Sequence, residues 1–430
     1  MFSSLKYRLR RLFREIWVPI GLYGLFAVLA AGIAWALRGI IPDSLAFSIG
    51  ADAIDSILNI LASSMLAVTT FSLSIMLSAF NTASSSATPR AFLLLKTDRT
   101  AQQVLASFIG AFIFSLVGII SLKVGIYGTG GRVILFFATL LVIAMIVVNL
   151  VRWIGHLTDF GRLGDTVARV ETAALAAMRH RLEEPFLGAR PLRHPVPDRA
   201  IPLLGERVGH IDFIDIARLD RLAKEAGALI YLDALPGEFR TVGQPIGYVA
   251  GGPVGEGFDT LLESFRDCIE ISMTRSFDQD PRFGIITLSE IASRALSPAV
   301  NDPGTAIDVI RRLARILGQW DRPVEPTVRF EHVFVRPLEA DDLLRDAFMA
   351  LARDGAALYE VQIALQKTLL ALTELHPGVF GVAASDQSGR AMRHAGAEMR
   401  IEADLDRLRG LHDRIVEIAD PGAPARIRRT

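Results

Sequence analysis

The chain has 430 residues, with 46 basic and 46 acidic side chains, and hydrophobic residues make up 51% of it. This length allows a membrane unit and one or two further domains, and the apolar composition argues against a purely soluble protein. Residues 1–152 carry a net charge of +7 and residues 153–430 a net charge of −7. The basic half is also the apolar half, as is typical where cationic loops flank membrane spans. The other half has no basic excess, so we expect no nucleic-acid partner.

Four stretches without a charged residue have the length that a bilayer-spanning helix needs, which is about 20 apolar residues. They are residues 17–37, 57–80, 104–122 and 133–151. The first is longer than the apolar region of a cleaved signal peptide, which runs about 7–15 residues, so we expect a retained anchor. The sequence therefore predicts a four-helix transmembrane domain over residues 1–152.

The charges of the loops predict the orientation of these spans. The segment before the first span and the loop of residues 81–103 are basic, whereas the loop of residues 38–56 is acidic. The short loop of residues 123–132 is basic and argues weakly for the opposite orientation. Because basic loops stay in the cytoplasm, their sum predicts a multi-pass protein of the bacterial inner membrane with both termini cytoplasmic.

The second span has a polar stripe along one side. At about 100° per residue, one face of the helix gathers six polar side chains, namely Asn59, Ser63, Thr70, Ser74, Ser78 and Asn81. We expect the opposite face to be apolar and to include Ile60, Leu66 and Leu77. Two interpretations stay open: the stripe holds neighbouring helices together, or it lines a water-filled path in a symmetric oligomer.

Two further patterns lie close to this stripe. In the third span, small residues recur at three- and four-residue spacing, which predicts close helix packing; they are Ser107, Ala111, Ser115 and Gly118. In the loop before it, Pro89 disfavours helix at Thr88. We interpret Arg90 as a partner of Asp98, as a ligand of lipid phosphate, or as a charge that only sets topology.

The rest of the chain is predicted to be mixed in structure. Helical periodicity continues through residues 153–184 as an extension of the fourth span. Five prolines within the next eighteen residues then exclude helix. Residues 185–257 are predicted to form this Pro-rich joint and a β-rich module with one short helix near Asp215–Ala226. Residues 258–430 are predicted to be a mostly helical cytoplasmic domain with a strand at Thr327–Val335.

Six helices are expected in that last domain. Their apolar spacing places them at Phe258–Ser272, Phe283–Leu296, Pro303 to about Trp320, Asp341–Arg353, Leu358–Leu375 and Met392–Ile418. The fold class that follows is an α-helical membrane protein with four transmembrane helices and a mixed α/β, mostly helical cytoplasmic region.

The segment Asn301-Asp302-Pro303 is a helix-start signal. Asp302 fits the N-cap, and Pro303 fits the first helical position. Together with Asp278, Asp280 and Glu290, the Asn301 and Asp302 side chains offer enough oxygen for a cation or for catalysis. These residues are separated in sequence, however, and capping explains Asp302 without such a site.

Motifs of enzymes are missing from the sequence. It contains no GxxxxGK[ST], no GxSxG and no HExxH, and no two of its eight histidines stand at ligand spacing. Its one cysteine, Cys268, is interpreted as a small buried side chain within a helix. We therefore expect no catalytic residue, no metal, no cofactor and no enzymatic activity.

Three segments together resemble a known family. They are Phe71-Ser72 through Thr88-Pro89-Arg90, Asp98 and Phe108–Phe112; RFGIITLSEIASRALSPAVNDPGTA at Arg282–Ala306; and DDLLRDAFMALARDG in the C-terminal part. This order resembles bacterial predicted membrane proteins known as domain of unknown function 2254. Thr88 stands where the family favours Ser, and Gly304 where it favours a larger or hydroxyl side chain. The resemblance implies a four-span inner-membrane protein with a cytoplasmic domain, and it implies no activity.

The leading functional hypothesis is an oligomeric, channel-like permeation protein whose second span lines the path. Its partners would be the lipid bilayer, further copies of the chain and an ion or small solute. The alternative is a membrane-anchored sensor or scaffold whose cytoplasmic domain binds a ligand or a protein. A membrane enzyme ranks last, because none of the motifs above is present.

Overall fold

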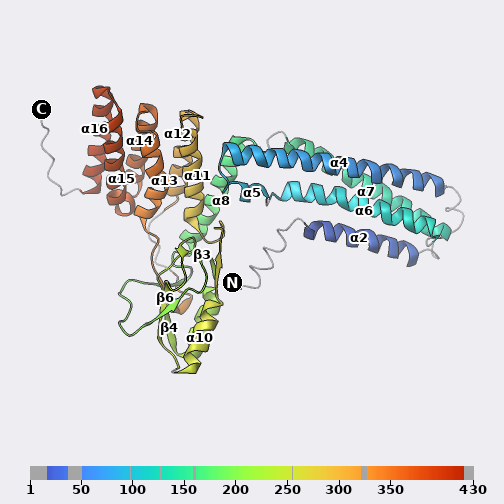
Figure 1. Ribbon diagram of the computed structural model, residues 1–430, viewed down its shortest axis with the longest axis horizontal. Coiled ribbons are helices and arrows are strands. Elements are labelled where there is room, and N and C mark those ends of the chain that lie inside the picture. Colours follow the sequence, from blue (N-terminus) through green and yellow to red (C-terminus); the bar gives the residue numbers. More distant parts are fainter. Residues whose placement is uncertain are drawn as a thin grey trace. The chain divides into compact units, whose positions relative to one another are not determined.

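The computed structural model describes residues 17–36, 51–96, 98–125, 128–157, 161–253, 255–320 and 327–420 (Figure 1). The chain divides into two compact units, with the boundary between Thr166 and Val167. The basic segment before the first predicted span and most of the acidic loop of residues 38–56 lie outside the described residues.

The first unit consists of helices, most of them long and apolar. They are α2 (Trp17–Ala36), α4 (Ala51–Ser86), α5 (Phe92–Lys96), α6 (Arg99–Lys123) and α7 (Gly128–Leu157). Three described segments are long and apolar enough to cross a bilayer, namely Ala53–Ser85, Arg99–Lys123 and Gly131–Leu157. They contain the second, third and fourth predicted spans, which are confirmed as helices of that kind. The crossing by α2 and the orientation in the membrane stay predictions.

Helix α6 is the centre of this unit, where it packs against α2, α4 and α7. The predicted face of small residues is buried: Ser107 and Ser115 are fully inaccessible, and Ala111 is 1% exposed. A Cβ atom on Gly118 would lie 2.9 Å from Cδ1 of Leu58 on α4. Side chains this small let α4 approach α6 closely, so the interpretation of this face as a packing surface is confirmed.

The second unit contains two sheets. Its strands are β1 (Ala189–Pro191), β2 (Ile201–Leu204), β3 (Gly209–Ile214), β4 (Ala228–Leu232), β5 (Phe239–Arg240), β6 (Pro245–Gly251), β7 (Ile269–Ser272) and β8 (Phe330–Val335). Five of them form one sheet in the order β1-β8-β4-β6-β2, and three form another in the order β5-β3-β7. Strand β8 pairs in parallel with β1 and β4, and the other pairs are antiparallel.

Nine helices in the described chain accompany or follow these sheets. They are α8 (Leu163–Glu183), α9 (Ile216–Ala226), α10 (Glu256–Arg266), α11 (Pro281–Ala295), α12 (Pro303–Leu317), α13 (Ala340–Asp354), α14 (Tyr359–Leu375), α15 (Pro377–Glu398) and α16 (Glu402–Ala419). Helix α9 packs on β4 and β8, and α11 to α16 pack side by side (Figure 1). Glu171 of α8 bonds to Arg312 and Arg315 of α12 at 2.5 and 2.7 Å.

The predicted helix Phe258–Ser272 is wrong in its second half. Helix α10 ends at Arg266, and Ile269–Ser272 is strand β7, which pairs with β3. The apolar spacing of this short stretch suits either structure. Pairing with β3 satisfies the backbone groups of the strand and so decides between the two.

The predicted helix Met392–Ile418 is also wrong, because it is two helices with a much earlier start. Helix α15 begins at Pro377, and the chain is non-helical from Met399 to Ile401 before α16 begins. The beginning of α15 is rich in Gly, Ala and Ser, which gives no strong helical periodicity. Its buried Ala384 and Ala391 explain the helix instead, since small side chains allow close packing against neighbouring helices.

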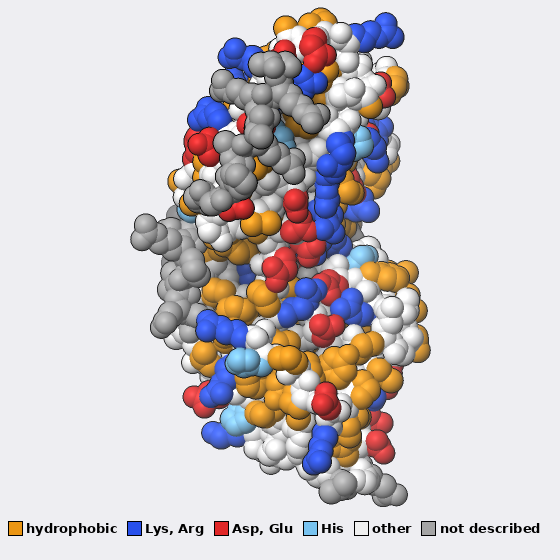
Figure 2. All heavy atoms as spheres, turned by 90° about the vertical axis from the view of Figure 1, so that its left-hand side faces the viewer, with side chains coloured by type: hydrophobic (Ala, Val, Ile, Leu, Met, Phe, Trp, Pro, Cys, Tyr) orange, Lys and Arg blue, Asp and Glu red, His pale blue; other side chains and the backbone are white. Residues whose placement is uncertain are grey.

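Charges on the surface are mixed in sign. On the face that Figure 2 shows, basic and acidic side chains lie among one another. Exposed ion pairs of the chain include Arg409 with Glu402 and Asp406, at 2.6 and 2.7 Å. Water screens exposed pairs of this kind, so they add little to the stability of the fold.

Cys268 is expected to be unreactive in the folded chain. It is 1% exposed, its Sγ donates to the backbone oxygen of Ser264 at 3.3 Å, and burial raises its pKa to about 12. The thiolate, which is the reactive form, is therefore scarce at neutral pH. A maleimide at neutral pH should label the protein only after denaturation, as measured by intact mass. Stoichiometric labelling of the folded protein within minutes would contradict this burial.

Candidate functional site

The polar stripe of the second span lies on the outside of its unit. All six of its residues, Asn59 to Asn81, are exposed on α4. The buried face of α4 is opposite, where Leu58, Leu61 and Met76 are at most 7% exposed. In the described unit the stripe therefore does not hold α4 against its own neighbours, and its role in lining a path stays a prediction.

The expected apolar face opposite the stripe is partly wrong. Ile60, Leu66 and Leu77 are 67, 53 and 58% exposed, so they lie on the same outer side as the stripe. At about 100° per residue these positions fall within about 60° of its centre line. The outer face of α4 is thus a polar stripe with apolar borders.

Three hydroxyl groups of the stripe bond to their own helix. Ser63 donates to the backbone oxygen of Asn59 at 2.9 Å, Thr70 to that of Leu66 at 3.0 Å, and Ser74 to that of Thr70 at 2.9 Å. These bonds satisfy each hydroxyl proton in apolar surroundings. The lone pairs of the same oxygens can still accept a bond from water or from another chain.

The loop after α4 follows the prediction made from Pro89. Helix α4 ends at Ser86, Thr88 is non-helical and 5% exposed, and Pro89 and Arg90 are exposed. Asp98 caps α6 by accepting from the backbone nitrogen of Ala101 at 2.7 Å, and its carboxylate lies 3.2 Å from Nε2 of His156. Asp98 therefore links the start of α6 to α7, while the role of Arg90 stays a prediction.

Asn301-Asp302-Pro303 begins α12 as predicted. Asp302 accepts from the Thr305 hydroxyl and from the backbone nitrogen of Thr305, the latter at 3.0 Å, and these two bonds lower the pKa of Asp302. Asn301 has a φ of 48°, a left-handed conformation that Asn tolerates better than most residues. The helix ends at Leu317, slightly before the expected Trp320.

The candidate acidic residues are spread over several positions: Asp278 and Asp280 precede α11, Glu290 lies within α11, and Asp302 precedes α12. Asp280 is the N-cap of α11, where it accepts from the backbone nitrogens of Arg282 and Phe283 at 3.1 and 3.2 Å, whereas Asp302 caps α12. Across the described residues, no three His, Cys, Asp or Glu side chains gather as metal ligands would.

A pocket rich in arginine lies beside the start of α11. Its volume is about 230 Å³. It is lined by the end of α8, the segment from β4 to β5, the segment from β7 into the start of α11, and Leu338. The residues are Arg181, Leu235, Pro236, Gly237, Glu238, Phe239, Arg240, Arg275, Pro281, Arg282 and Leu338. Four arginines and one glutamate therefore line the same small space.

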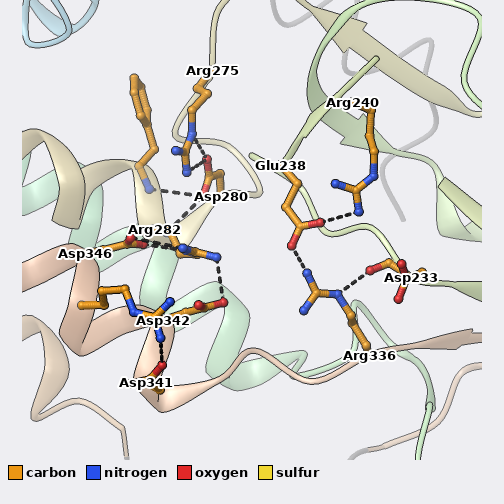
Figure 3. Close-up of polar contacts among 12 residues, drawn as sticks. Asp233, Glu238, Arg240, Arg275, Asp280, Arg282, Arg336, Asp341, Asp342 and Asp346 are labelled. Carbon is orange, nitrogen blue, oxygen red and sulfur yellow. Dashed lines mark hydrogen bonds and ion pairs between the residues drawn. The ribbon is translucent and has the colours of Figure 1, made fainter. Parts of the chain in front are cut away.

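Most of these charges pair within the chain. Arg282 lies between Asp342 and Asp346, which it bonds at 2.9 and 2.6 Å (Figure 3). Arg275 bonds to Asp280 at 2.7 Å. Burial nevertheless raises the pKa of the Asp280 carboxyl, against the opposing effect of Arg275.

On the other side of the pocket, Glu238 bridges two arginines. It accepts from Arg240 at 2.8 Å and also bonds to Arg336 (Figure 3). Gly237 has a φ of 92°, and a Cβ atom there would collide with the carboxylate of Asp280. Only glycine allows the chain to pass this close to that side chain.

Sequence reasoning missed this pocket because its residues come from four separated segments. None of them forms a motif of fixed spacing. The one local signal is Arg181 near the end of a helix, which resembles an ordinary C-terminal basic residue. Its burial follows only from the tertiary packing.

The structure defines a membrane protein with apolar helices and a second unit of mixed sheets and helices. The chain belongs to the family described as predicted membrane protein DUF2254, whose model matches residues 14–371, and this confirms the resemblance noted in the sequence. Uncharacterized proteins of Mycobacterium bovis and Mycobacterium tuberculosis are each 30% identical to it over 234 residues.

A counterpart from a second Mycobacterium tuberculosis strain is 29% identical. These matches cover 52% of this chain and 44% of each relative, so the chain spans less than half the length of the curated relatives it matches. No solved structure matches the chain.

Proposed function

We propose that the chain forms a homo-oligomer in the bacterial inner membrane, with the stripe of α4 from each copy lining a path for an ion or small solute. The observation that carries this proposal is the outward position of the stripe on α4. Both termini are cytoplasmic in this arrangement, and the protein acts without enzymatic chemistry.

The chemistry of the outer face supports an oligomer. Six polar side chains facing hydrocarbon are unfavourable compared with the same side chains facing water or another helix. The apolar borders, such as Ile60 and Leu66, can contact adjacent copies while the stripe faces the centre. A ring of hydroxyl oxygens around a common axis is a usual lining for a solute path.

Replacing Ser74 with leucine should abolish ion flux while the protein still folds and assembles. Leucine adds bulk and removes the hydroxyl at a position where all copies would meet. The measurement is single-channel current across a planar bilayer that holds the purified full-length protein, with assembly checked by light scattering. A matched control is Leu141→Ser, because Leu141 is a 64% exposed residue of α7 rather than α4. Equal single-channel current in the wild type and in Ser74→Leu would contradict the proposal.

Thiol accessibility gives a second test of the same path. In a Cys268→Ala background, a cysteine at Ser74 or Thr70 should react with a charged methanethiosulfonate and block the current. A cysteine at Leu73, which is 50% exposed but outside the stripe, should not react. The reagent attacks thiolates that contact water. A cysteine at Leu73 that reacts as fast as one at Ser74 or Thr70 would contradict a water-lined stripe.

A second candidate function is a membrane-anchored sensor whose second unit binds a ligand, and the arginine pocket favours it. A sensor should show no current in well-folded oligomer, but should bind a small molecule in the unit that begins at Val167. A serine–histidine contact within the described chain does not support an enzyme either. Ser388 lies 2.8 Å from Nδ1 of His412 but is completely buried, so a substrate cannot reach it.

A further inference from the structure

One arginine of the pocket beside α11 is left with unused hydrogen-bond donors. Arg181 is 4% exposed, and its Nη1 donates to the backbone oxygen of Pro185 at 3.2 Å. Its Nε and Nη2 have no hydrogen-bond partner among the described residues. The other three lining arginines each bond to a carboxylate of the chain.

The two unused donors lie on the same edge of the guanidinium plane. Nε–H and Nη2–H point in parallel and fit two oxygens of one acceptor group. Arg282 uses the same edge on Asp346, with Nε 2.6 Å from one carboxylate oxygen and Nη2 3.1 Å from the other. The edge of Arg181 therefore has the donor geometry for a carboxylate or phosphate, and no side chain of the described protein supplies one.

The energetic cost of burying the Arg181 charge is a second argument that an acceptor group is missing from the pocket. Burial lowers the pKa of Arg181 to about 10, which means that the folded chain holds its charge at a cost. A buried ionised group is normally paired and fully hydrogen-bonded. The neighbouring Arg336 adds to the cost by repulsion, and Asp280 offsets it only in part.

We propose that this pocket binds a small oxyanion, whose two oxygens accept the Nε–H and Nη2–H of Arg181. The ligand is a carboxylate or a phosphate of a small solute, because both groups have the required pair of oxygens. A volume of about 230 Å³ suits a molecule smaller than a nucleotide. Leu235, Phe239 and Leu338 line the same space and can contact its apolar part. This site does not depend on the α4 path.

The test is a titration of the purified full-length protein in detergent, in Tris chloride buffer without any oxyanion. One arm adds inorganic phosphate and the other adds succinate, and sodium chloride of equal ionic strength serves as the reference. We expect phosphate or succinate to raise the melting temperature more than sodium chloride does, and the rise to saturate. The anion that gives the saturating rise identifies the class of ligand.

Two substitutions of Arg181 separate its charge from its geometry. Arg181→Met should weaken binding by at least about tenfold, and so should Arg181→Lys, which keeps the charge but loses the paired donors. Arg353→Met, a control at an exposed arginine whose side chain is 64% accessible, should leave binding unchanged. The absence of saturation with both probes in the wild type, or equal stabilisation of Arg181→Met, would overturn the proposal.

Discussion

Replacing Arg275 with methionine should lower the free energy of unfolding by about 3 kcal/mol or more. The side chain of its partner Asp280 is only 3% exposed, and the two bond at 2.7 Å. Without Arg275, a buried carboxylate at the start of α11 loses its counter-charge, although it keeps the two backbone bonds of the cap. Chemical denaturation of the full-length protein in detergent measures the change.

A double variant separates the lost pairing from the lost packing. In Arg275→Met with Asp280→Asn, the carboxylate charge is gone and asparagine still caps the helix, so most of the stability should return. Arg353→Met should cost at most about 1 kcal/mol, because that arginine forms an exposed pair with Asp354. If the double variant is as unstable as Arg275→Met alone, the cost comes from packing and not from the buried charge.

The pH dependence of Arg275→Met follows from Asp280. Burial raises the pKa of this carboxyl above its ordinary value of 3.8, and removal of Arg275 raises it further. A raised carboxyl pKa means that the folded state binds the proton more tightly than the unfolded state does. Its contribution to stability is therefore present at acidic pH and lost as the pH rises through the folded pKa. The difference in free energy of unfolding between the wild type and Arg275→Met should therefore be smaller at acidic pH than at neutral pH. A difference that does not change with pH would contradict this account.

Replacing Arg181 with methionine should stabilise the protein, in contrast to Arg275→Met. Without ligand, the free energy of unfolding should rise by on the order of 2 kcal/mol. Methionine fills a similar volume without a charge that burial disfavours. The pKa of Arg181 is about 10 in the folded chain, below its ordinary value, so the wild type carries the full cost at neutral pH. Raising the pH through the folded pKa should therefore narrow the difference between the two proteins. Denaturation in oxyanion-free buffer measures the gain, and a loss of stability would show that Arg181 is structurally required.

The fold could be predicted from the sequence wherever one local signal decides the structure. Long charge-free stretches predicted the helices α4, α6 and α7, and Asp302 followed by Pro303 predicted the start of α12. The sequence failed where distant partners decide, because β7 becomes a strand by pairing with β3. It failed again at α15, whose small residues become helical in close contact with their neighbours.

The candidate sites divide in the same way. Helical periodicity alone predicted that the polar residues of α4 share one side, because that depends only on the rise and turn of a helix. Which way this side faces depends on where α6 packs, and the misplaced Ile60 and Leu66 show that limit. The arginine pocket lay beyond prediction, since its polar groups meet only after α8, β5 and α11 are in place.

The pairing of β8 has a consequence for the order in which the protein forms on the ribosome. Ala189 of β1 and Ile230 of β4 both pair with β8, which lies after α12 in the chain. Until β8 has left the ribosome tunnel, the edge of β4 has no neighbour on that side and β1 has no partner strand. Unpaired edges of this kind favour aggregation. The edge of β4 therefore stays without β8 while α10, α11 and α12 are synthesised, and an expression fragment that stops before Phe330 would retain that open edge.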